Sequence, residues 1–450
     1  MIISAMGATA SGGAAVGSST DPGQTLTTED LSILALENET VAGHTCKVIL
    51  LEDRIEPEAL RASIAARLDR APQLSLRLTE VDGAPRWVPA SELDLDAHVA
   101  VTGGPDPLDL LEFRKTVART FEERLDRSRP LWRIDVIPKL AWGGSALIWR
   151  IHHALADGFA SMQMANGALW DEEPPPDGPQ RGTRKRSGSA TSHPRVAHDR
   201  LAALRTAMRE APQPWLQSPF SGQIGAQREV AFASVELDGL RNAARIVDGA
   251  TLNDAILAVV AGGLHRWLQD HHGHFEAVRV KVPVSLHAAA TGVGGQGGEP
   301  GNRDSFFCLD LPVGPAEPLE RLAAIHRATR TRKDGHDAQL LDDLMRELAK
   351  VPPLREFAER ALAHPRSFAL NVSNVVGPRR PCRVLGARVN ELYSLAEIRE
   401  QHALRIAVVS LCDSLNFGLV ADPTLLEDVA GIAADIEAEA AALVAQIKDV

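Results

Sequence analysis

The spacing of apolar residues along the chain predicts both helices and strands. Leu60, Ile64 and Leu68 recur at four-residue intervals, and the same spacing recurs over 108–125, so both segments should be amphipathic helices. Short apolar or alternating runs have the spacing of strands. Strands are predicted at 46–51, 132–136, 145–151, 277–285, 306–313, 368–374, 404–411 and 415–420.

The helix marked by Leu60, Ile64 and Leu68 is placed at 57–68. Further helices are predicted at 159–170 and 251–268, twice within 318–350, and at 425–447. Strands and helices are mixed along the chain rather than segregated, which indicates an α/β fold. A length of 450 residues is typical of two or three domains.

Changes of composition divide the chain into four parts. Residues 1–25 form a leader of small residues, and residues 26–172 form a first mixed α/β domain. Residues 173–226 contain three consecutive prolines and a basic run, which is typical of a crossover linker. The mixed pattern returns over 227–450. We therefore predict two α/β domains joined by a linker.

The linker carries a basic cluster in an acidic chain, formed by Arg181, Arg184, Lys185, Arg186 and Arg195. A solvated linker is one interpretation, because charge runs usually face water. Contact with an anionic lipid surface or with phosphates is the other. The sequence leaves both interpretations open.

The balance of charge disfavours a nucleic-acid partner. The chain has 59 acidic and 48 basic side chains and a formal charge of −11, whereas nucleic-acid-binding proteins usually carry a basic face. Aromatic residues make up only 4% of the chain, so stacking platforms for bases are not expected either.

The four cysteines lie far apart in sequence, without a CxxC pair, at Cys46, Cys308, Cys382 and Cys412. This spacing disfavours a zinc site and a disulfide framework and indicates a reducing compartment, so we expect a cytoplasmic location. No apolar run approaches the length of about 18 residues that predicts a membrane-spanning helix.

One short segment carries the most specific chemistry. His152, His153, Asp157 and Gly158 follow the strand predicted at 145–151 directly. Asp157 is well placed to cap the next helix, because its carboxylate can accept a hydrogen bond from a backbone N–H there. His153 then lies in a strand-to-helix turn, where a side chain can face a cleft.

Three interpretations of this segment compete. A metal site is disfavoured, because His152 and His153 are adjacent and point to opposite faces of a strand. A purely structural pair of hydrogen-bonded histidines is the second interpretation. The third is general base catalysis by His153, since a neutral imidazole with a pKa of about 6.5 can take a proton from an attacking alcohol. The chain has no GxSxG elbow, which disfavours a hydrolase triad.

The segment HHALADG at 152–158 resembles the HHxxxDG active-site motif of coenzyme A-dependent acyltransferases. Other segments narrow the resemblance to the wax ester synthase/diacylglycerol acyltransferase family, and they occur in the family's order between about residues 26 and 420. They are the opening 26–30 with Glu37 and His44, Pro130-Leu131-Trp132, Asn253-Asp254, Pro283-Val284-Ser285, Gly301-Asn302 and LNVSNVVGP at 370–378.

The resemblance implies a fold of two chloramphenicol acetyltransferase-like α/β domains with an active-site tunnel between them. It implies acyl-CoA as a co-substrate, with no separate cofactor and no metal, and a long-chain alcohol or diacylglycerol as acceptor. Because such acceptors dissolve in lipid, we expect a peripheral association with a membrane or lipid-droplet surface.

The resemblance also assigns roles to residues. His153 is the expected general base, with Asp157 and His152 holding its turn. Asn253 is expected to stabilise an oxyanion or position a substrate, with a helix N-cap as the alternative; Asp254 would complete that helix start. The expected substrate-binding residues are Trp132, for which a structural role is the alternative, Gly158, Ser373 and Asn374.

Departures from the family pattern keep other functions open. Thr28 and Val376 replace prolines, and Leu411 and Asp413 stand where the family has a tyrosine and a glycine. A charged Asp413 in a lipid-lined pocket would be costly. A second hypothesis is therefore an enzyme of the same superfamily, of the acyltransferase or condensation type, that uses another thioester donor or a more polar acceptor. A third is a lipid-binding paralogue without catalysis.

Overall fold

The computed structural model describes residues 23–171, 200–212, 218–285, 304–348, 358, 360–362, 364–399 and 401–447. The predictions for most of the leader, for the basic cluster of the linker and for Asn302 lie outside these residues.

The first sheet has six strands in the order β12-β13-β2-β7-β6-β5. The two central strands, β2 and β7, are buried along their whole length and pair antiparallel, with His44 opposite His152. Apolar and β-branched residues on both faces explain this central position. The strands are β2 His44–Leu51, β5 Val99–Val101, β6 Trp132–Ile137, β7 Ser145–His152, β12 Arg383–Val384 and β13 Ala387–Ala396.

Helices and a small hairpin complete the first unit. Helix α4 begins where Asp109 accepts a hydrogen bond from the backbone N–H of Glu112, and it buries Phe113, Val117 and Phe121. The other elements are β1 Gln24–Thr25, α1 Thr28–Leu36, α2 Pro57–Ala65, the 3₁₀ turns Leu68–Arg70 and Pro72–Ser75, β3 Leu76–Val81, β4 Ala84–Pro89, α3 Leu95–His98, α4 Leu110–Glu122 and α5 Gly158–Ala168.

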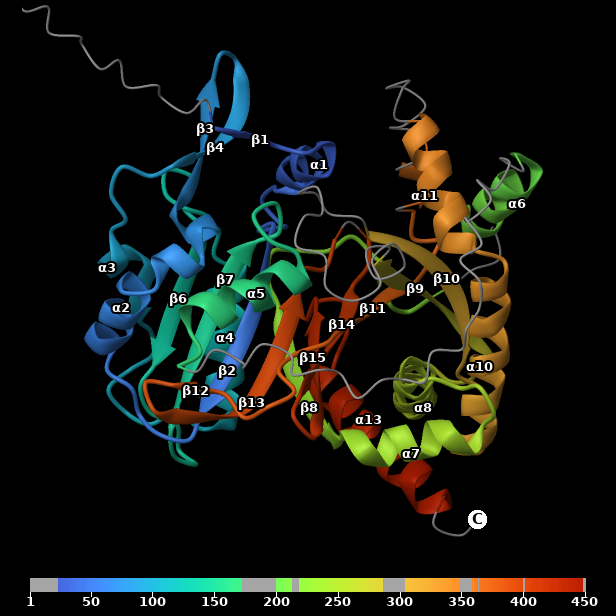
Figure 1. The fold of residues 1–450 in the computed structure, drawn as a ribbon. Helices are drawn as coiled ribbons and strands as arrows, with labels where there is room; N and C mark the ends of the chain where they lie inside the picture. The colour runs from blue at the N-terminus through green and yellow to red at the C-terminus, as the bar shows by residue number, and fades with distance from the viewer. Residues whose placement is uncertain are drawn as a thin grey trace, which may run out of the picture.

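The second sheet also has six strands, in the order β10-β9-β11-β14-β15-β8. Figure 1 shows it beside the first sheet, with helices α7, α8, α10 and α13 grouped on one side of it. Its elements are α6 Arg200–Glu210, β8 Glu229–Glu236, α7 Leu237–Ile246, α8 Leu252–His271, β9 Ala277–Ser285, β10 Asp304–Pro312, α10 Pro318–Asp334, α11 Asp337–Leu348, β11 Leu370–Val375, β14 Leu404–Leu411, β15 Ser414–Ala421 and α13 Val429–Gln446.

The C-terminal half of the chain contributes two strands, β12 and β13, to the first sheet. Strand β13 pairs antiparallel with β2, so residues from the C-terminal half extend the first sheet. The chain then returns to the second sheet as β14. A division of the chain at residue 227 does not predict this arrangement, in which the chain crosses from the second sheet to the first after β11 and returns before β14.

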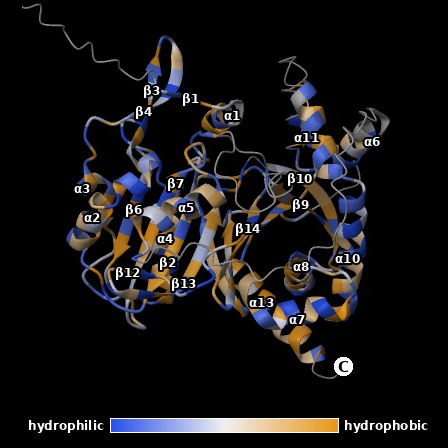
Figure 2. Ribbon diagram, viewed as in Figure 1, coloured by the Kyte–Doolittle hydropathy of each residue, from blue (hydrophilic) through white to orange (hydrophobic). Residues whose placement is uncertain are grey.

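Each sheet buries apolar residues on both faces. One large cluster joins Leu404, Ile406 and Val408 of β14 to helices α8 and α13. A second cluster joins the other face of β14, through Val409 and Leu411, to helix α5 and the first sheet. Figure 2 shows hydrophobic residues concentrated in the strands of both sheets, whereas α10 and α11 carry many hydrophilic residues. The face of β14 that carries Val409 and Leu411 is thus directed toward the first unit.

Most predicted elements are confirmed within one to four residues at their ends. Strands β9 and β14 have the predicted bounds, and the helix predicted over 57–68 ends earlier, at Ala65, before a 3₁₀ turn. The short strands β1, β3, β4, β5 and β12 were not predicted, and neither were the longer strands β8 and β13. In the part of the chain that the structure describes, no helix is both long and apolar enough to cross a membrane.

Candidate active site

The turn between β7 and α5 carries the histidine pair. Strand β7 ends at His152, and α5 begins at Gly158. The side chain of Asp157 accepts a hydrogen bond of 2.6 Å from the backbone N–H of Ala160, so Asp157 is the N-cap, as predicted. This cap fixes where the helix starts and thereby the length of the turn that presents His153.

The two histidines have different surroundings. His152 is 1% exposed, and its Nδ1 accepts a hydrogen bond of 3.1 Å from the backbone N–H of Ala154. A neutral ring then carries its proton on Nε2, which lies 3.4 Å from Oε2 of Glu37. The backbone N–H of His153 donates to the carbonyl of Gly43 over 3.0 Å. The ring of His152 thus ties the turn to Glu37, the residue after α1, and the backbone of His153 ties it to Gly43, the residue before β2. The ring of His153 is left for other contacts.

Glu37 connects the turn to a surface arginine. Its Oε2 also accepts a hydrogen bond of 2.6 Å from Arg127. Burial raises the pKa of Glu37, but the hydrogen bonds from His152 and Arg127 outweigh this effect and hold the pKa below its usual range. Glu37 is thus a carboxylate that orients His152.

The imidazole of His153 is half-buried, and its Nδ1 is buried with no hydrogen-bond partner among the described residues. Burial and the positive charges of Arg399 and Arg405 lower the pKa of His153 to about 3. A hydrogen bond to the backbone of His153 itself raises the pKa, but by less than burial and the arginines lower it. The ring is therefore neutral at physiological pH, which is the form that can accept a proton.

Strand β11 of the second sheet lies directly against this turn. A Cβ atom built on Gly158 would lie 2.9 Å from Cγ2 of Val375. Asn371 and Ser373 alternate with the buried Leu370 and Val372, so they share the face of Val375. Asn374 is exposed and belongs to the other face. Of the two predicted substrate-binding residues here, only Ser373 lies on the strand face directed toward the His153 turn.

Two arginines beside His153 were not predicted from the sequence. Arg405 lies on β14, and Arg399 lies between β13 and β14. Nη1 of Arg405 donates to the carbonyl of Glu397 over 3.0 Å, while its Nε is buried without a partner among the described residues. Burial, together with the charge of Arg399, lowers the pKa of Arg405 to about 9. No motif marks these residues, since arginine is common in any strand or loop.

Glu397 is the acidic residue of this region. It forms an ion pair of 3.0 Å with Arg228, and both side chains are almost fully buried. Burial raises the pKa of Glu397 to about 7 although Arg228, its ion-pair partner, lowers it. Arg228 engages Oε1 of this carboxylate, whereas Oε2 is buried with no hydrogen-bond partner among the described residues. Arg405 donates its hydrogen bond to the backbone carbonyl of Glu397.

Lys47 is a further residue that the sequence did not single out. Its Nζ donates a hydrogen bond of 2.7 Å to Oγ of Ser394 on β13. Burial lowers the pKa of Lys47 to about 8, while the charge of Asp157 raises it. Lys47 thus contacts β13 through Ser394, and its charge interacts with that of Asp157, the N-cap of α5.

Trp132 supports the core of the first unit. It is 2% exposed, its Nε1 donates to the carbonyl of Leu74 over 2.7 Å, and its ring stacks on His98 at 4.4 Å. The carbonyl of Leu131 accepts the backbone N–H of His152. These contacts favour the structural interpretation of the Pro-Leu-Trp segment, and the ring has almost no surface open to a substrate.

The Asn253-Asp254 pair is only partly as predicted. Thr251, not Asn253, is the N-cap of α8, so the N-cap interpretation of Asn253 is wrong. Asp254 completes a capping box with Thr251, as predicted, and accepts further hydrogen bonds from His326 and Thr329 of α10. A role of Asn253 toward a substrate stays a prediction.

Asp413, the residue that suggested a more polar acceptor, does not lie in a buried pocket. Asp413 is exposed in the turn between β14 and β15. Its position therefore gives no support to a charged group in a substrate pocket. Within the described part of the chain, no three His, Cys, Asp or Glu residues come together in a way that could hold a metal ion.

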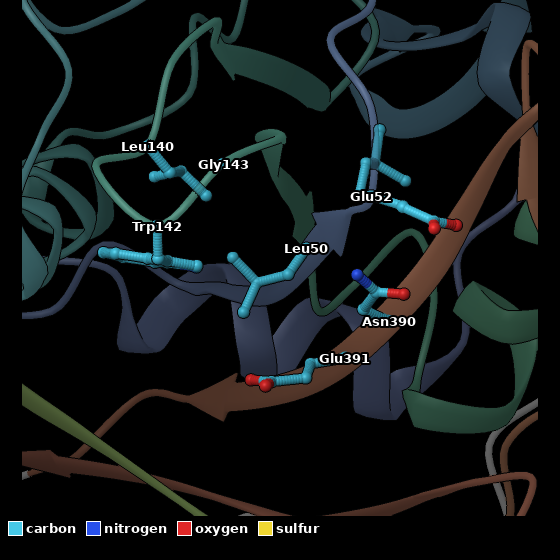
Figure 3. Close-up of a pocket in the computed structure, with 8 residues that line it drawn as sticks. Leu50, Glu52, Leu140, Trp142, Gly143, Asn390 and Glu391 are labelled. Carbon is cyan, nitrogen blue, oxygen red and sulfur yellow. The ribbon is translucent and has the colours of Figure 1, made fainter.

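A cavity of about 230 Å³ lies away from the histidine turn. Figure 3 shows its lining side chains, with Leu50 and Glu52 near the end of β2, Trp142 on the loop before β7, and Asn390 and Glu391 on β13. His44 and Leu51 are the two ends of β2, about 20 Å apart at strand spacing. The cavity is thus at the opposite end of the sheet from His153.

Two family models match the chain. The model described as the wax ester synthase/diacylglycerol acyltransferase catalytic domain matches residues 26–210. The model described as the WS/DGAT C-terminal domain matches residues 300–443.

Curated relatives from mycobacteria match over nearly the whole chain. A Mycobacterium tuberculosis protein named probable diacylglycerol O-acyltransferase tgs1 is 30% identical over 416 residues, which cover 87% of this chain and 88% of the relative. A putative diacylglycerol O-acyltransferase of Mycobacterium bovis matches with the same identity and coverage.

Solved structures share the fold. A wax ester synthase/diacylglycerol acyltransferase from Marinobacter aquaeolei VT8 superposes with a TM-score of 0.69 at 23% identity, covering 94% of this chain and 100% of that one. The starter condensation domain of rhizomide synthetase superposes with a TM-score of 0.55 at 14% identity, covering 94% of each chain. The fold of two chloramphenicol acetyltransferase-like α/β domains, expected from the sequence, is thereby confirmed.

Proposed function

Because this chain belongs to the wax ester synthase/diacylglycerol acyltransferase family, we propose that it transfers a long-chain acyl group from acyl-CoA to diacylglycerol or a long-chain alcohol, with His153 as general base. That the chain is an acyltransferase follows from the family. The acceptor and the role of His153 are the parts that we propose. The observation that carries them is the position of a neutral, half-buried His153 on a capped turn between two sheets.

The proposed reaction needs no covalent enzyme intermediate. The acceptor hydroxyl attacks the thioester carbon while the imidazole of His153 takes its proton. The carbonyl electrons move to oxygen, and the tetrahedral intermediate then collapses and expels the CoA thiolate. The thiolate takes the proton from the imidazolium, so that acyl-CoA and an alcohol give an ester and free CoA. Nδ1 of His153 is buried, so Nε2 is the nitrogen that we assign to proton transfer.

Exposed apolar residues beside the turn support a lipid acceptor. Phe159, next to Gly158, is 65% exposed, and Val376, next to Val375, is 62% exposed. Gly158 and Val375 are in contact, so the two exposed side chains flank the same point on the surface. Large exposed apolar groups of this kind favour contact with a lipid or membrane surface.

A peripheral association with a membrane or lipid droplet is therefore part of the proposal. Its test is flotation with liposomes that contain diacylglycerol. The variant Phe159→Ser with Val376→Ser should float less than the wild type. Leu111→Ser, a matched change at a residue that is 59% exposed and belongs to α4, should float like the wild type. Equal flotation of all three proteins would remove this part of the proposal.

The catalytic assignment is tested by CoA release from a long-chain acyl-CoA. Release should depend on added diacylglycerol or long-chain alcohol, and His153→Ala should lower kcat at least about 10²-fold. His274→Ala is the matched control, since His274 is exposed and paired only with Glu276. An active His153→Ala variant would contradict the base assignment, and a wild type that uses only polar acceptors would contradict the proposed acceptor.

The alternative donor can be separated in the same assay. The fold is shared with condensation domains, and one of them is described in complex with C8-CoA and Leu-SNAC. Acyl-carrier protein and acyl-CoA of the same chain length should therefore be compared as donors. We expect the rate with acyl-CoA to be the higher one, and a strong preference for the carrier protein would favour the condensation-type alternative.

A further inference from the structure

Asn371 and Arg405 form a polar pair on the face of the second sheet that is directed toward the first unit. They are register partners on the neighbouring parallel strands β11 and β14. Four residues farther along, their strands carry Val375 and Val409, which are also register partners. Residues four apart on a strand share a face. Because Val375 packs against Gly158, this face is the one that meets the turn of His153.

Both side chains of the pair have buried polar atoms without partners among the described residues. These atoms are Nε of Arg405 and Oδ1 of Asn371. A buried polar atom without a partner costs about 1–3 kcal/mol, and more for a charged group. Such a cost at two neighbouring positions is typical of a site whose ligand supplies the missing hydrogen bonds.

The charges around the pair are mainly positive. Arg399 and Arg405 both act on His153. Among the described residues, the carboxylate that acts on Arg405 is that of Glu397, and its Oε1 pairs with Arg228. His152, the other titratable group that acts on His153, adds no negative charge. The positive charges around Asn371 and Arg405 therefore favour the binding of a negatively charged group of a ligand.

We propose that Arg405 is a catalytic residue that, with the amide of Asn371, binds the oxyanion of the tetrahedral intermediate. The proposal rests on the proposed function, because the oxyanion forms when the acceptor oxygen attacks the thioester carbon. Nε–H of Arg405 donates to that oxyanion. Oδ1 of Asn371 is an acceptor and cannot itself bind an anion, so the proposal requires a half-turn rotation of the amide, which places the donor NH₂ group where Oδ1 lies. When the intermediate collapses, the electron pair returns to the carbonyl and the CoA thiolate leaves.

The CoA phosphates are a less suitable partner for this pair. The diphosphate of CoA is separated from the thioester carbon by the whole pantetheine arm. Arg405, by contrast, lies close enough to the catalytic imidazole to act on its charge. A donor whose charge acts on the catalytic imidazole is better placed for the reacting carbon than for the distant phosphates, and preorganised donors aimed at a developing oxyanion are among the largest contributions to catalysis.

The position of Arg405 also explains how His153 can work as a base although its pKa is strongly lowered. The two guanidinium groups disfavour an imidazolium in the free protein. An oxyanion that forms beside Arg405 neutralises this effect at the moment when His153 takes the proton. Proton transfer and oxyanion formation are thereby coupled, because each charge stabilises the other.

Steady-state kinetics of CoA release test the proposal. Arg405→Met should lower kcat about 10²- to 10³-fold with KM values for acyl-CoA and acceptor within about threefold of wild type. Arg405→Lys, which keeps the charge but loses the planar donor, should recover part of the loss. Asn371→Leu should lose about 10-fold. Arg245→Met removes an exposed arginine of α7 and is the control, with wild-type kcat expected.

Several results would overturn the proposal. A kcat of Arg405→Met within about fivefold of wild type would do so, and so would a loss confined to KM for acyl-CoA or for the acceptor. If the wild type proves to use a different acceptor, the proposed function fails, but the same comparison on that reaction still tests Arg405.

A binding measurement keeps the test independent of turnover and of the acceptor. The probe is an acyl-CoA analogue in which a trifluoromethyl ketone replaces the thioester carbonyl, because this group hydrates to a tetrahedral carbon. Arg405→Met should weaken its binding at least 10-fold. The binding of a thioether analogue without a carbonyl should stay unchanged. Equal effects on both analogues, or none on the ketone, would contradict the proposal even if Arg405→Met folds poorly.

Discussion

Oε2 of Glu37 lies 3.4 Å from Nε2 of His152 and 2.6 Å from a guanidinium nitrogen of Arg127. This carboxylate therefore fixes His152 from one side, while the backbone N–H of Ala154 fixes the ring from the other. His153 follows directly in the chain. The orientation of the proposed base thus depends on the residue that follows α1, more than 100 positions away in sequence.

The first prediction concerns this carboxylate. Glu37→Leu should leave the buried Nε2 of His152 unpaired, which costs about 1–3 kcal/mol of unfolding free energy. We also expect kcat to fall about 10-fold, because a displaced turn misplaces His153. Arg127→Gln, at a residue 49% exposed, should cost less than about 1 kcal/mol and leave kcat near wild type. Denaturant unfolding and CoA release measure both; equal losses in the two variants would contradict the argument.

The second prediction concerns the contact between Gly158 and Val375. A methyl group at position 158 would lie 2.9 Å from Cγ2 of Val375, and valine is too stiff to move that group freely. Gly158→Ala should therefore destabilise the protein by about 1–3 kcal/mol and lower kcat by 10-fold or more.

A second substitution tests the cause. Val375→Ala removes the methyl group that is in the way, so the double variant Gly158→Ala, Val375→Ala should recover a large part of the lost activity. Gly225→Ala is a control, since its Cβ would meet no atom closer than 3.6 Å. Additive losses in the double variant would show that the contact is not the reason.

Much of the site is local, and the sequence predicts it for that reason. Asp157 caps α5 because a carboxylate placed immediately before a helix reaches the free backbone N–H groups of its first turn. The capping box of Thr251 and Asp254 is equally local, yet we expected Asn253 as the alternative cap, because Asn is as good a cap residue as Thr.

The rest of the site depends on pairing between distant segments. Strand β13 has a bulge between Val389 and Glu391, which interrupts the alternation that identifies a strand. The strand predicted at 404–411 is correct. The position of Arg405 near the site, however, depends on the pairing of β14 with β11, which the sequence does not predict. The contact between His152 and Glu37 could not be predicted either, since no sequence rule relates the residue after α1 to the end of β7.

The third prediction concerns pH and the two histidines that are buried in the neutral form. Burial is the largest effect on both, and the pKa values of His44 and His153 are lowered to about 3. The unfolded chain binds protons at these side chains below about pH 6.5, whereas the folded protein does not until about pH 3. The stability contributed by each neutral ring is therefore complete above pH 6.5 and is lost as pH falls.

We test this with His44, whose ring packs edge-on against Phe121 and has two buried nitrogens without partners among the described residues. Between pH 8 and pH 5 the unfolding free energy of the wild type should fall by about 2 kcal/mol more than that of His44→Leu. The leucine keeps the apolar contact and removes the titrating group. Denaturant unfolding at both pH values measures the difference, and carboxylates contribute little to it because both proteins contain the same ones. Parallel losses in the two proteins would mean that His44 is protonated in the folded state, which its burial and the nearby charge of Arg150 oppose.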